Sequence, residues 1–172
     1  MNVGFPSPPE TKGTSMVAAH DKYVVFCLGE TRFAVPILQV LRIVRLTPIT
    51  RVPNAPHFLE GVVTYRGQAV PIIDLHKRLA LPVAEYVYAA RILVVEVGSQ
   101  IIGMLVDAVV DILHLPKEII QPPPEMVADV NGVYLLGVAQ HDGQTVVILD
   151  LSRVLTVEQI AGVSAWQAEA NG

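Results

Sequence analysis

The sequence predicts an all-β fold with short helices, built as two small β-barrels packed face to face. Three observations lead to this prediction. The 172-residue chain repeats part of its own sequence in tandem, and each copy contains short apolar runs separated by two-residue turn signals. Hydrophobic residues make up 52% of the chain and charged residues only 16%, so there is ample apolar surface for a large core. About ten short strands in two equivalent sets suit a pair of barrels.

The repeat is visible as a constant offset along the chain. Residues 61–79 align with residues 137–155 at an offset of 76, and nine of these nineteen positions are identical. A preceding segment repeats at an offset of 69, where Gly29, Val40, Ile43 and Leu46 match Gly98, Val109, Ile112 and Leu115. The difference of seven between the two offsets corresponds to one insertion in a Pro-rich connector. The repeats therefore span about residues 23–79 and 91–155.

Turn residues divide each repeat into hairpins. Residues 23–28 and 33–36 flank a turn that begins at Gly29, and residues 91–97 and 101–105 flank the equivalent turn at Gly98. Asp142-Gly143 lies between two further apolar runs and predicts a type I′ turn, which needs positive φ at both central positions. Its counterpart is Arg66-Gly67, so Arg66 is expected at a turn and not inside a strand.

Two segments and the chain ends are less regular. The apolar positions of residues 35–41 and 105–113 suit either a short helix or a strand, and their periodicity does not decide between the two. Residues 151–162 are expected to form a closing helix, which Ser152 or Thr156 could cap. Residues 1–20 and 163–172 are expected to be mobile tails, which leaves one domain at 21–162.

Composition excludes several classes of protein. The formal net charge of −4 argues against binding to a nucleic-acid backbone, and the only cysteine, Cys27, excludes an intrachain disulfide. The N-terminal segment contains three prolines and no apolar core, unlike a secretory signal peptide. Charged residues interrupt the most hydrophobic stretch, 92–115, whereas a membrane helix needs about 20 mainly apolar residues. We therefore expect a cytoplasmic protein without a membrane-inserted segment.

Catalytic and metal-binding patterns are missing from the sequence. It contains no nucleophile-elbow, phosphate-loop, dinucleotide-binding or zinc-protease motif. The five histidines have no metal-ligand spacing, so we expect surface or turn positions for them and neither a metal nor a cofactor. Cys27 alternates within an apolar strand, which favours a small buried thiol over a nucleophile. Asp74 and Asp150 are equivalent positions of the two repeats, and helix capping explains them better than a catalytic carboxylate pair.

The two repeats differ most clearly in charge. Arg42 aligns with Asp111, Arg45 with His114, and Arg66 with Asp142, while Thr50 and Arg51 extend the arginine cluster of the first repeat. Such a cluster is either an ordinary solvated face or a site for an acidic or polar partner surface, because the guanidinium fork suits carboxylates. Val40 and Ile43 lie on either side of Arg42, and apolar residues beside arginine are typical of interface hot spots, although either could be core.

Several sequence blocks resemble the CheW family of chemotaxis coupling proteins. The blocks are YVVFCLG at residue 23, FAVPI at 33, TRVPNAP at 50, EGVVTYRG at 60, VPIIDL at 70, GMLVD at 103 and GV at 137. The resemblance covers roughly residues 22–160. It implies two five-stranded SH3-like β-barrel subdomains and a non-catalytic adaptor. Such an adaptor couples the cytoplasmic tip of methyl-accepting chemoreceptors to the regulatory domain of the histidine kinase CheA, and other CheW copies can join it in rings.

By motif match, the resemblance also implies receptor-binding residues. These are Arg66 and Gly67 at a turn beside the groove between subdomains, and Val40, Arg42 and Ile43 on a bordering ridge. The family commonly has a glutamate at the position of Arg42, and that glutamate pairs with the arginine at position 66. Here a different acid, such as Glu60 or Glu30, pairs with Arg66, or the pair is absent. The resemblance does not indicate residues for binding the kinase.

Three functional hypotheses remain open from the sequence. The first is the adaptor, either in an ordinary chemotaxis pathway or as a paralogue that serves pili or surface behaviour. The second is a regulatory module of the CheA type, because CheA carries the same fold at its C-terminal end. The third is a small-ligand-binding β-barrel or an unrecognised enzyme, which only the apolar composition favours.

Overall fold

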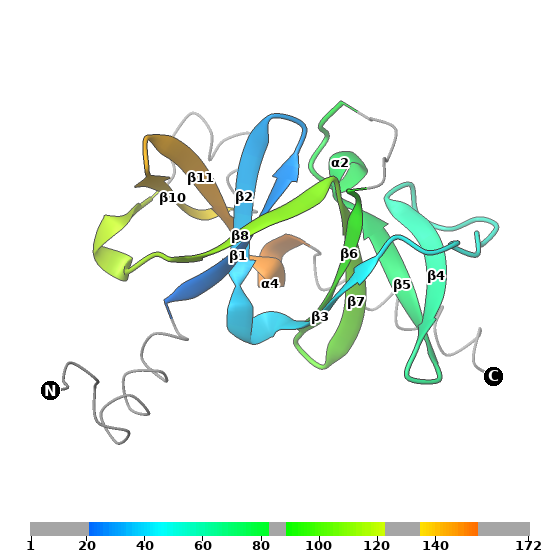
Figure 1. The fold of residues 1–172 in the computed structure, drawn as a ribbon. Helices are drawn as coiled ribbons and strands as arrows, with labels where there is room; N and C mark the ends of the chain where they lie inside the picture. The colour runs from blue at the N-terminus through cyan, green and yellow to red at the C-terminus, as the bar shows by residue number, and fades with distance from the viewer. Residues whose placement is uncertain (1–20, 83–88, 123–134, 155–172) are drawn as a thin grey trace, which may run out of the picture.

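A computed structural model describes residues 21–82, 89–122 and 135–154, which fold into two twisted, mostly antiparallel sheets (Figure 1). The predicted all-β fold with short helices is confirmed. The strands are β1 Lys22–Leu28, β2 Thr31–Pro36, β3 Val40–Arg45, β4 Leu59–Tyr65, β5 Gln68–Asp74, β6 Arg91–Val97, β7 Gln100–Val106, β8 Ala108–His114, β9 Ile120–Gln121, β10 Leu135–His141 and β11 Gln144–Leu149. The helical segments are the 3₁₀ turns η1 Ile37–Gln39 and η2 Lys117–Ile119 and the α-helices α2 Leu75–Arg78 and α4 Leu151–Val154.

Each sheet combines strands from both sequence repeats. The first sheet has the order β8-β1-β2-β11-β10-β9, and the second has the order β3-β6-β7-β5-β4. The first hairpin of each repeat therefore joins the later strands of the other repeat, through the parallel pairs β2–β11 and β5–β7. The five strands of the second sheet each have an equivalent in the first, which also contains the two-residue β9. The second sheet has a single bridge, Thr50–Val62, at the place of the β9–β10 pairing.

The core has three parts because the strands of both sheets are buried on two faces. The central cluster lies between the sheets and takes alternate residues of β1, such as Val24 and Phe26, with residues of β6, β7 and both α-helices. A second cluster on the other face of the first sheet includes Tyr23 and Val25. A third cluster fills the second sheet's own barrel. Burial on both faces explains why the strands read as continuous apolar runs instead of alternating ones.

The predicted turns have the expected backbone. Arg66 and Gly67 have φ of 53° and 77°, and their equivalents Asp142 and Gly143 have φ of 50° and 76°. Positive φ at both central positions defines the type I′ turn that the sequence predicts. Arg66 is therefore at the exposed tip of the β4–β5 hairpin, outside the ladder of hydrogen bonds.

Aspartates precede both α-helices and cap their first turns. The Asp74 carboxylate accepts a hydrogen bond of 2.9 Å from the backbone N–H of His76, and Asp150 accepts equivalent bonds from the N–H and hydroxyl of Ser152 at 3.0 and 2.6 Å. The capping role predicted for both aspartates is confirmed. The expectation that Ser152 caps the closing helix is wrong, because Ser152 lies inside α4 and Asp150 precedes it.

The structure also decides the two segments that periodicity left open. Residues 35–41 contain the end of β2, the 3₁₀ turn η1 and the start of β3, while residues 105–113 are strand apart from a bend at Asp107. The predicted tails 1–20 and 163–172, and Thr156 of the closing helix, lie outside the described residues. Among the residues that are described, no helix has the length and hydrophobicity needed to cross a membrane.

Candidate functional site

Strand β3 is an edge strand whose middle is exposed to solvent. Val40 is half-buried and packs against the central core, whereas Arg42 and Ile43 are exposed. The pairing of β3 with β6 shifts by one residue between Val40 and Arg42, which leaves Leu41 in a bulge. A bulge interrupts the alternation of side chains between two faces, so that Leu41, Arg42 and Ile43 are exposed in succession. Leu41 and Ile43 expose 42% and 38% of their surface on either side of Arg42 in the chain.

Strand β8 repeats this arrangement at the edge of the first sheet. Its pairing with β1 shifts at the equivalent place, and Val110, Asp111 and Ile112 are exposed in succession. Sequence reasoning noted the charge of Asp111 but missed the exposed aliphatic side chains on either side of it. The signal was available, since Ile43 and Ile112 are equivalent in the repeat, but burial on an edge strand depends on the bulge.

The turn that carries Arg66 and Gly67 lies on a different part of the second sheet. Strands β3 and β4 stand at opposite ends of the strand order, and the turn is at the tip of the β4–β5 hairpin. The Arg66 guanidinium lies 5.2 Å from the ring centre of Tyr65, a cation–π distance. The predicted receptor-binding residues thus come from the edge strand β3 and from the β4–β5 turn.

Glu60 does not pair with Arg66. Its carboxylate lies 2.6 Å from Lys77 Nζ and 3.8 Å from Arg51. The other acid considered, Glu30, lies in the β1–β2 turn of the first sheet. Arg66 thus projects from the turn with only the adjacent ring of Tyr65 as a described contact.

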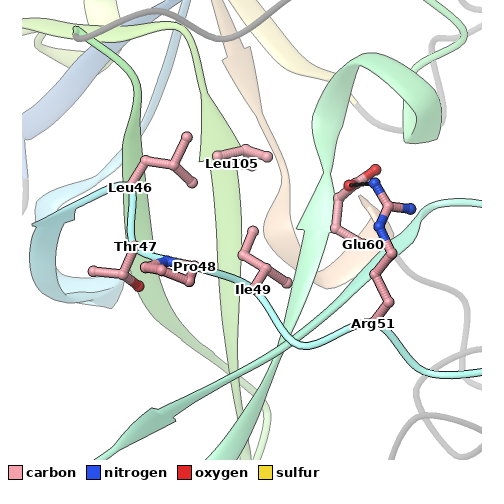
Figure 2. A pocket seen from close by; sticks show the side chains of 7 residues that line it. All are labelled: Leu46, Thr47, Pro48, Ile49, Arg51, Glu60 and Leu105. Atoms are coloured by element: carbon pink, nitrogen blue, oxygen red, sulfur yellow. Dashed lines mark ion pairs between the residues drawn. The ribbon is translucent and has the colours of Figure 1, made fainter.

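A hollow of about 430 Å³ opens beside Glu60 at one end of the second barrel (Figure 2). Figure 2 shows an apolar side formed by Leu46, Ile49 and Leu105 and a charged rim formed by the ion pair Arg51–Glu60. Leu105 and Ile49 belong to the cluster that fills this barrel, so the hollow reaches the barrel's own core.

The first barrel is closed where the second is open. Leu115 is the sequence equivalent of Leu46, yet Leu115 is fully buried and Leu46 exposes 37% of its surface. The N–H of Leu115 donates to the carbonyl of Asp21 at 2.8 Å, which extends the β1–β8 pairing by one residue and draws Leu115 over the core. In the second barrel the equivalent carbonyl, that of Ala90, accepts from the Arg91 guanidinium at 2.8 Å.

His76 corrects the expectation that the histidines are surface or turn residues. Its side chain is 2% exposed, with Nδ1 2.8 Å from the Pro82 carbonyl oxygen and Nε2 2.9 Å from Asp107 Oδ1. The second oxygen of Asp107 accepts from the N–H of Gly29 at 2.7 Å. This network connects α2 of the second sheet with the β1–β2 hairpin of the first. Sequence reasoning missed it because Asp107 lies 31 positions away along the chain.

Cys27 is less buried than the sequence predicts. The thiol was expected to be buried, but Cys27 is half-buried, because it lines a surface hollow together with Gly29 and Arg32. In the described ranges there is no group of three or more histidine, cysteine, aspartate or glutamate side chains placed to hold a metal ion. Burial and the nearby Asp21 carboxylate raise the pKa of the Tyr23 phenol, which lies in the core of the first barrel and not at these surfaces.

Comparison with known proteins identifies the family. Residues 22–159 match the family described as the CheW-like domain. The chain belongs to the CheW-like family. It is 35% identical to the chemotaxis protein CheW of Rhizobium meliloti over 136 residues, covering 79% of this chain and 88% of that one. It is 32% identical to the chemotaxis protein CheW of Klebsiella aerogenes over 140 residues, covering 81% and 84% of the two chains.

A solved structure supports the same fold. The crystal structure of the scaffolding protein TtCheW from Thermoanaerobacter tengcongensis superposes with a TM-score of 0.75 at 32% identity, covering 81% of this chain and 90% of that chain. The resemblance seen in the sequence is thereby confirmed, and with it the CheW-like fold of two barrels. The family consists of chemotaxis scaffold proteins, which makes the exposed strands and turns the natural candidates for function.

Proposed function

We propose that this CheW-like chain is a non-catalytic adaptor that couples methyl-accepting chemoreceptors to the histidine kinase CheA in a cytoplasmic chemosensory array. One observation carries the proposal. The exposed aliphatic and arginine side chains of β3 and the Arg66 turn belong to a sheet whose inner strands are buried, but they contribute little to its core. Side chains that a fold presents without needing them for packing are suited to an intermolecular contact.

The receptor contact is proposed at Val40, Arg42, Ile43, Arg66 and Gly67. Val40 anchors the ridge because it packs against the central core, and Gly67 allows the positive φ that lets the tip of the turn fold back. Arg66 then supplies up to five donors in a planar fork to a polar partner. Kinase-binding residues are left unassigned.

Arg42 favours a particular variant of this function. An arginine at position 42 gives the exposed part of β3 a positive charge. We propose a paralogue matched to a particular receptor set, such as the receptors of a pathway controlling pili or surface behaviour.

Titration with and without one charge reversal tests the adaptor. The protein is titrated with the CheA regulatory domain and with a receptor cytoplasmic fragment from the same genome. Arg66→Glu is expected to weaken receptor binding by about tenfold while kinase binding stays unchanged, because a turn arginine holds little of the core. Asp142→Lys is the matched control, since it reverses the charge at the equivalent turn of the first barrel.

Two outcomes would contradict the proposal. Unchanged receptor affinity for Arg66→Glu would overturn the assignment of the turn to the receptor contact. Binding of the wild-type protein to neither partner would overturn the adaptor function and favour a kinase regulatory module or a ligand-binding barrel.

A further inference from the structure

The ring of His76 lies between two groups that accept hydrogen bonds. Nδ1 is 2.8 Å from the carbonyl oxygen of Pro82, Nε2 is 2.9 Å from Asp107 Oδ1, and the side chain is 2% exposed. A carbonyl oxygen and an ionised carboxylate have no hydrogen to donate, whereas a neutral imidazole has one N–H and one lone pair. With Asp107 ionised, both contacts are hydrogen bonds only when the ring carries a proton on each nitrogen.

Asp107 has the contacts of an ionised carboxylate. Its Oδ2 accepts a hydrogen bond of 2.7 Å from the backbone N–H of Gly29, and its side chain is 23% exposed. The two oxygens therefore face two separate donors, the Gly29 amide and the His76 ring, so that neither oxygen needs a proton of its own. An imidazolium that is paired and hydrogen-bonded in this way avoids much of the cost of burying a charge.

The other charged groups around His76 come from β5, α2 and the β1–β2 turn. Asp74 at the end of β5 accepts a hydrogen bond of 2.9 Å from the His76 N–H and places a second carboxylate beside this residue. Lys77 of α2 is paired with Glu60, whose Oε1 lies 2.6 Å from the lysine Nζ. Strand β7 packs against α2 without a charged residue, and the remaining charged residues of α2 and of the turn are Arg78 and Glu30. The carboxylates of Asp74 and Asp107 thus offset the positive charge of the imidazolium.

We infer that His76 is an imidazolium whose second proton holds the segment after α2 to the junction of the two barrels. When pH rises and this proton is lost, the ring keeps one N–H, and only one of its two contacts remains a hydrogen bond. A bond to an ionised carboxylate is stronger than one to a neutral carbonyl, so the remaining proton stays on Nε2 and faces Asp107. The Pro82 carbonyl then loses its donor, and residues 79–82 loosen from the junction while the contact with Gly29 is kept. No partner of the proposed function takes part in this device, so it operates whether or not the chain is an adaptor.

Two readings on the isotopically labelled protein test this inference across a pH titration. The nitrogen chemical shifts of the His76 ring report which nitrogens carry protons. Hydrogen exchange of the Leu81 amide reports the segment, because its N–H donates to the His76 carbonyl at 2.7 Å. In the wild type, the neutral ring is expected to keep its proton on Nε2. As the second proton is lost, the protection factor of Leu81 is expected to fall about fivefold, as for one lost hydrogen bond, while that of Gly29 stays unchanged.

Asp107→Asn replaces an acceptor by a side-chain amide that can also donate. The amide N–H can donate to Nε2 and the amide oxygen can accept from Gly29, so a neutral ring then keeps its Nδ1–H on the Pro82 carbonyl. The neutral ring of this variant is therefore expected to carry its proton on Nδ1, opposite to the wild type. The protection factor of Leu81 is expected to become independent of pH, because both ring contacts survive without a second proton.

Two further variants control for the loss of a histidine. His76→Phe keeps an aromatic ring but has no N–H, so the protection factor of Leu81 should be low at every pH. His114→Gln removes an exposed histidine of β8, and both readings should remain those of the wild type.

Several outcomes would overturn the inference. One is a neutral wild-type ring with its proton on Nδ1, and another is a Leu81 protection factor that stays constant while the ring loses its second proton. A Leu81 response in Asp107→Asn equal to that of the wild type would show that the carboxylate is not the cause. If Asp107→Asn does not fold, the wild-type readings and His76→Phe decide the question by themselves.

Discussion

The two barrels follow one plan, yet one is closed at its end and the other is open. Leu115 closes the first barrel and is fully buried, while the equivalent Leu46 leaves a hollow beside Leu105 in the second. The residue type is the same, so hydrophobicity does not explain the difference. The backbone contacts do differ, since the N–H of Leu115 donates to the Asp21 carbonyl, whereas the equivalent carbonyl of Ala90 accepts from the Arg91 guanidinium. A duplicated core can thus acquire a specialised surface without a change in its apolar pattern.

The second difference concerns the junctions where the chain crosses between sheets. At one junction Asp107 connects His76 of α2 with Gly29 of the first hairpin through both carboxylate oxygens. At the equivalent junction, the residue corresponding to Asp107 is Leu38, which is 58% exposed on η1. The crossing at Asp107 is therefore stabilised by polar contacts, whereas the crossing at Leu38 exposes an aliphatic side chain just before the exposed residues of β3.

The largest expected effect on stability concerns two equivalent glycines, one in each barrel, that leave no room for a side chain. A Cβ atom added at Gly61 would lie 2.1 Å from the Thr50 carbonyl oxygen, and the backbone there has φ of +149°. Gly61→Ala is expected to lower the free energy of unfolding by about 4 kcal/mol, from a clash with backbone combined with conformational strain. Urea unfolding followed by circular dichroism measures this loss.

Gly137→Ala is the matched variant in the first barrel. Its added Cβ would lie 2.6 Å from the Gln121 carbonyl oxygen, a less severe overlap, so the loss is expected to be smaller, at about 2 kcal/mol. Gly29→Ala is the control, with positive φ but nothing within 4 Å. A loss below about 1 kcal/mol for Gly61→Ala would show that the crossing segment at Thr50 moves freely.

The next effect measures the closed and open ends directly. Leu115→Ala is expected to destabilise the protein by about 3 kcal/mol, because it removes a fully buried side chain and leaves a cavity. Leu46→Ala should cost less than about 1 kcal/mol, because the side chain is partly exposed beside an existing hollow. Chemical denaturation of the pair checks this difference. Equal losses would mean that both barrels are closed in solution.

A smaller effect distinguishes the two junctions. Asp107→Ala removes the partner of the buried His76 ring and of the Gly29 N–H, and is expected to cost about 2 kcal/mol. Leu38→Ala at the equivalent junction should cost less than about 0.5 kcal/mol, since that side chain is mostly exposed. Thermal unfolding of both variants compares them. If Asp107→Ala is as stable as Leu38→Ala, the polar network does not stabilise the crossing.

Much of the fold follows from local signals in the sequence. The hairpins, the type I′ turns at Arg66 and Asp142, and the aspartate caps depend on a few neighbouring residues, and the structure confirms them. The exchange of strands between repeats could not be predicted, because the repeat pattern is the same whether a hairpin pairs within its own copy or with the other one. The parallel pairing of β2 with β11 decides this, and it joins residues more than 100 positions apart.

The candidate site shows the same division between local and distant signals. Arg66 could be placed at a turn from its own sequence neighbours. Its relation to Arg42 could not, because the two belong to strands at opposite ends of one sheet. His76 was assigned to the surface since nothing near it in sequence indicates Asp107, and the hollow beside Leu46 is lined by residues as far apart in sequence as Leu46 and Leu105. Contacts of this kind depend on how distant segments of the chain pack together and not on the local sequence pattern.

The smallest expected effect on stability is also the sharpest comparison of the two barrels. Arg66 and Asp142 occupy equivalent turn positions with φ of 53° and 50°, a conformation that asparagine adopts more easily than arginine. Arg66→Asn gains in backbone preference and loses the stacking of the guanidinium on Tyr65, so the free energy of unfolding should change by less than about 0.5 kcal/mol. Receptor binding should nevertheless weaken, because the donor fork is gone, and calorimetry against the receptor fragment measures this. Asp142→Asn should leave both quantities unchanged. If Arg66→Asn binds the receptor fragment as tightly as the wild type, Arg66 does not contribute to the receptor contact. This position of the first repeat is then no more important for binding than the equivalent position of the second.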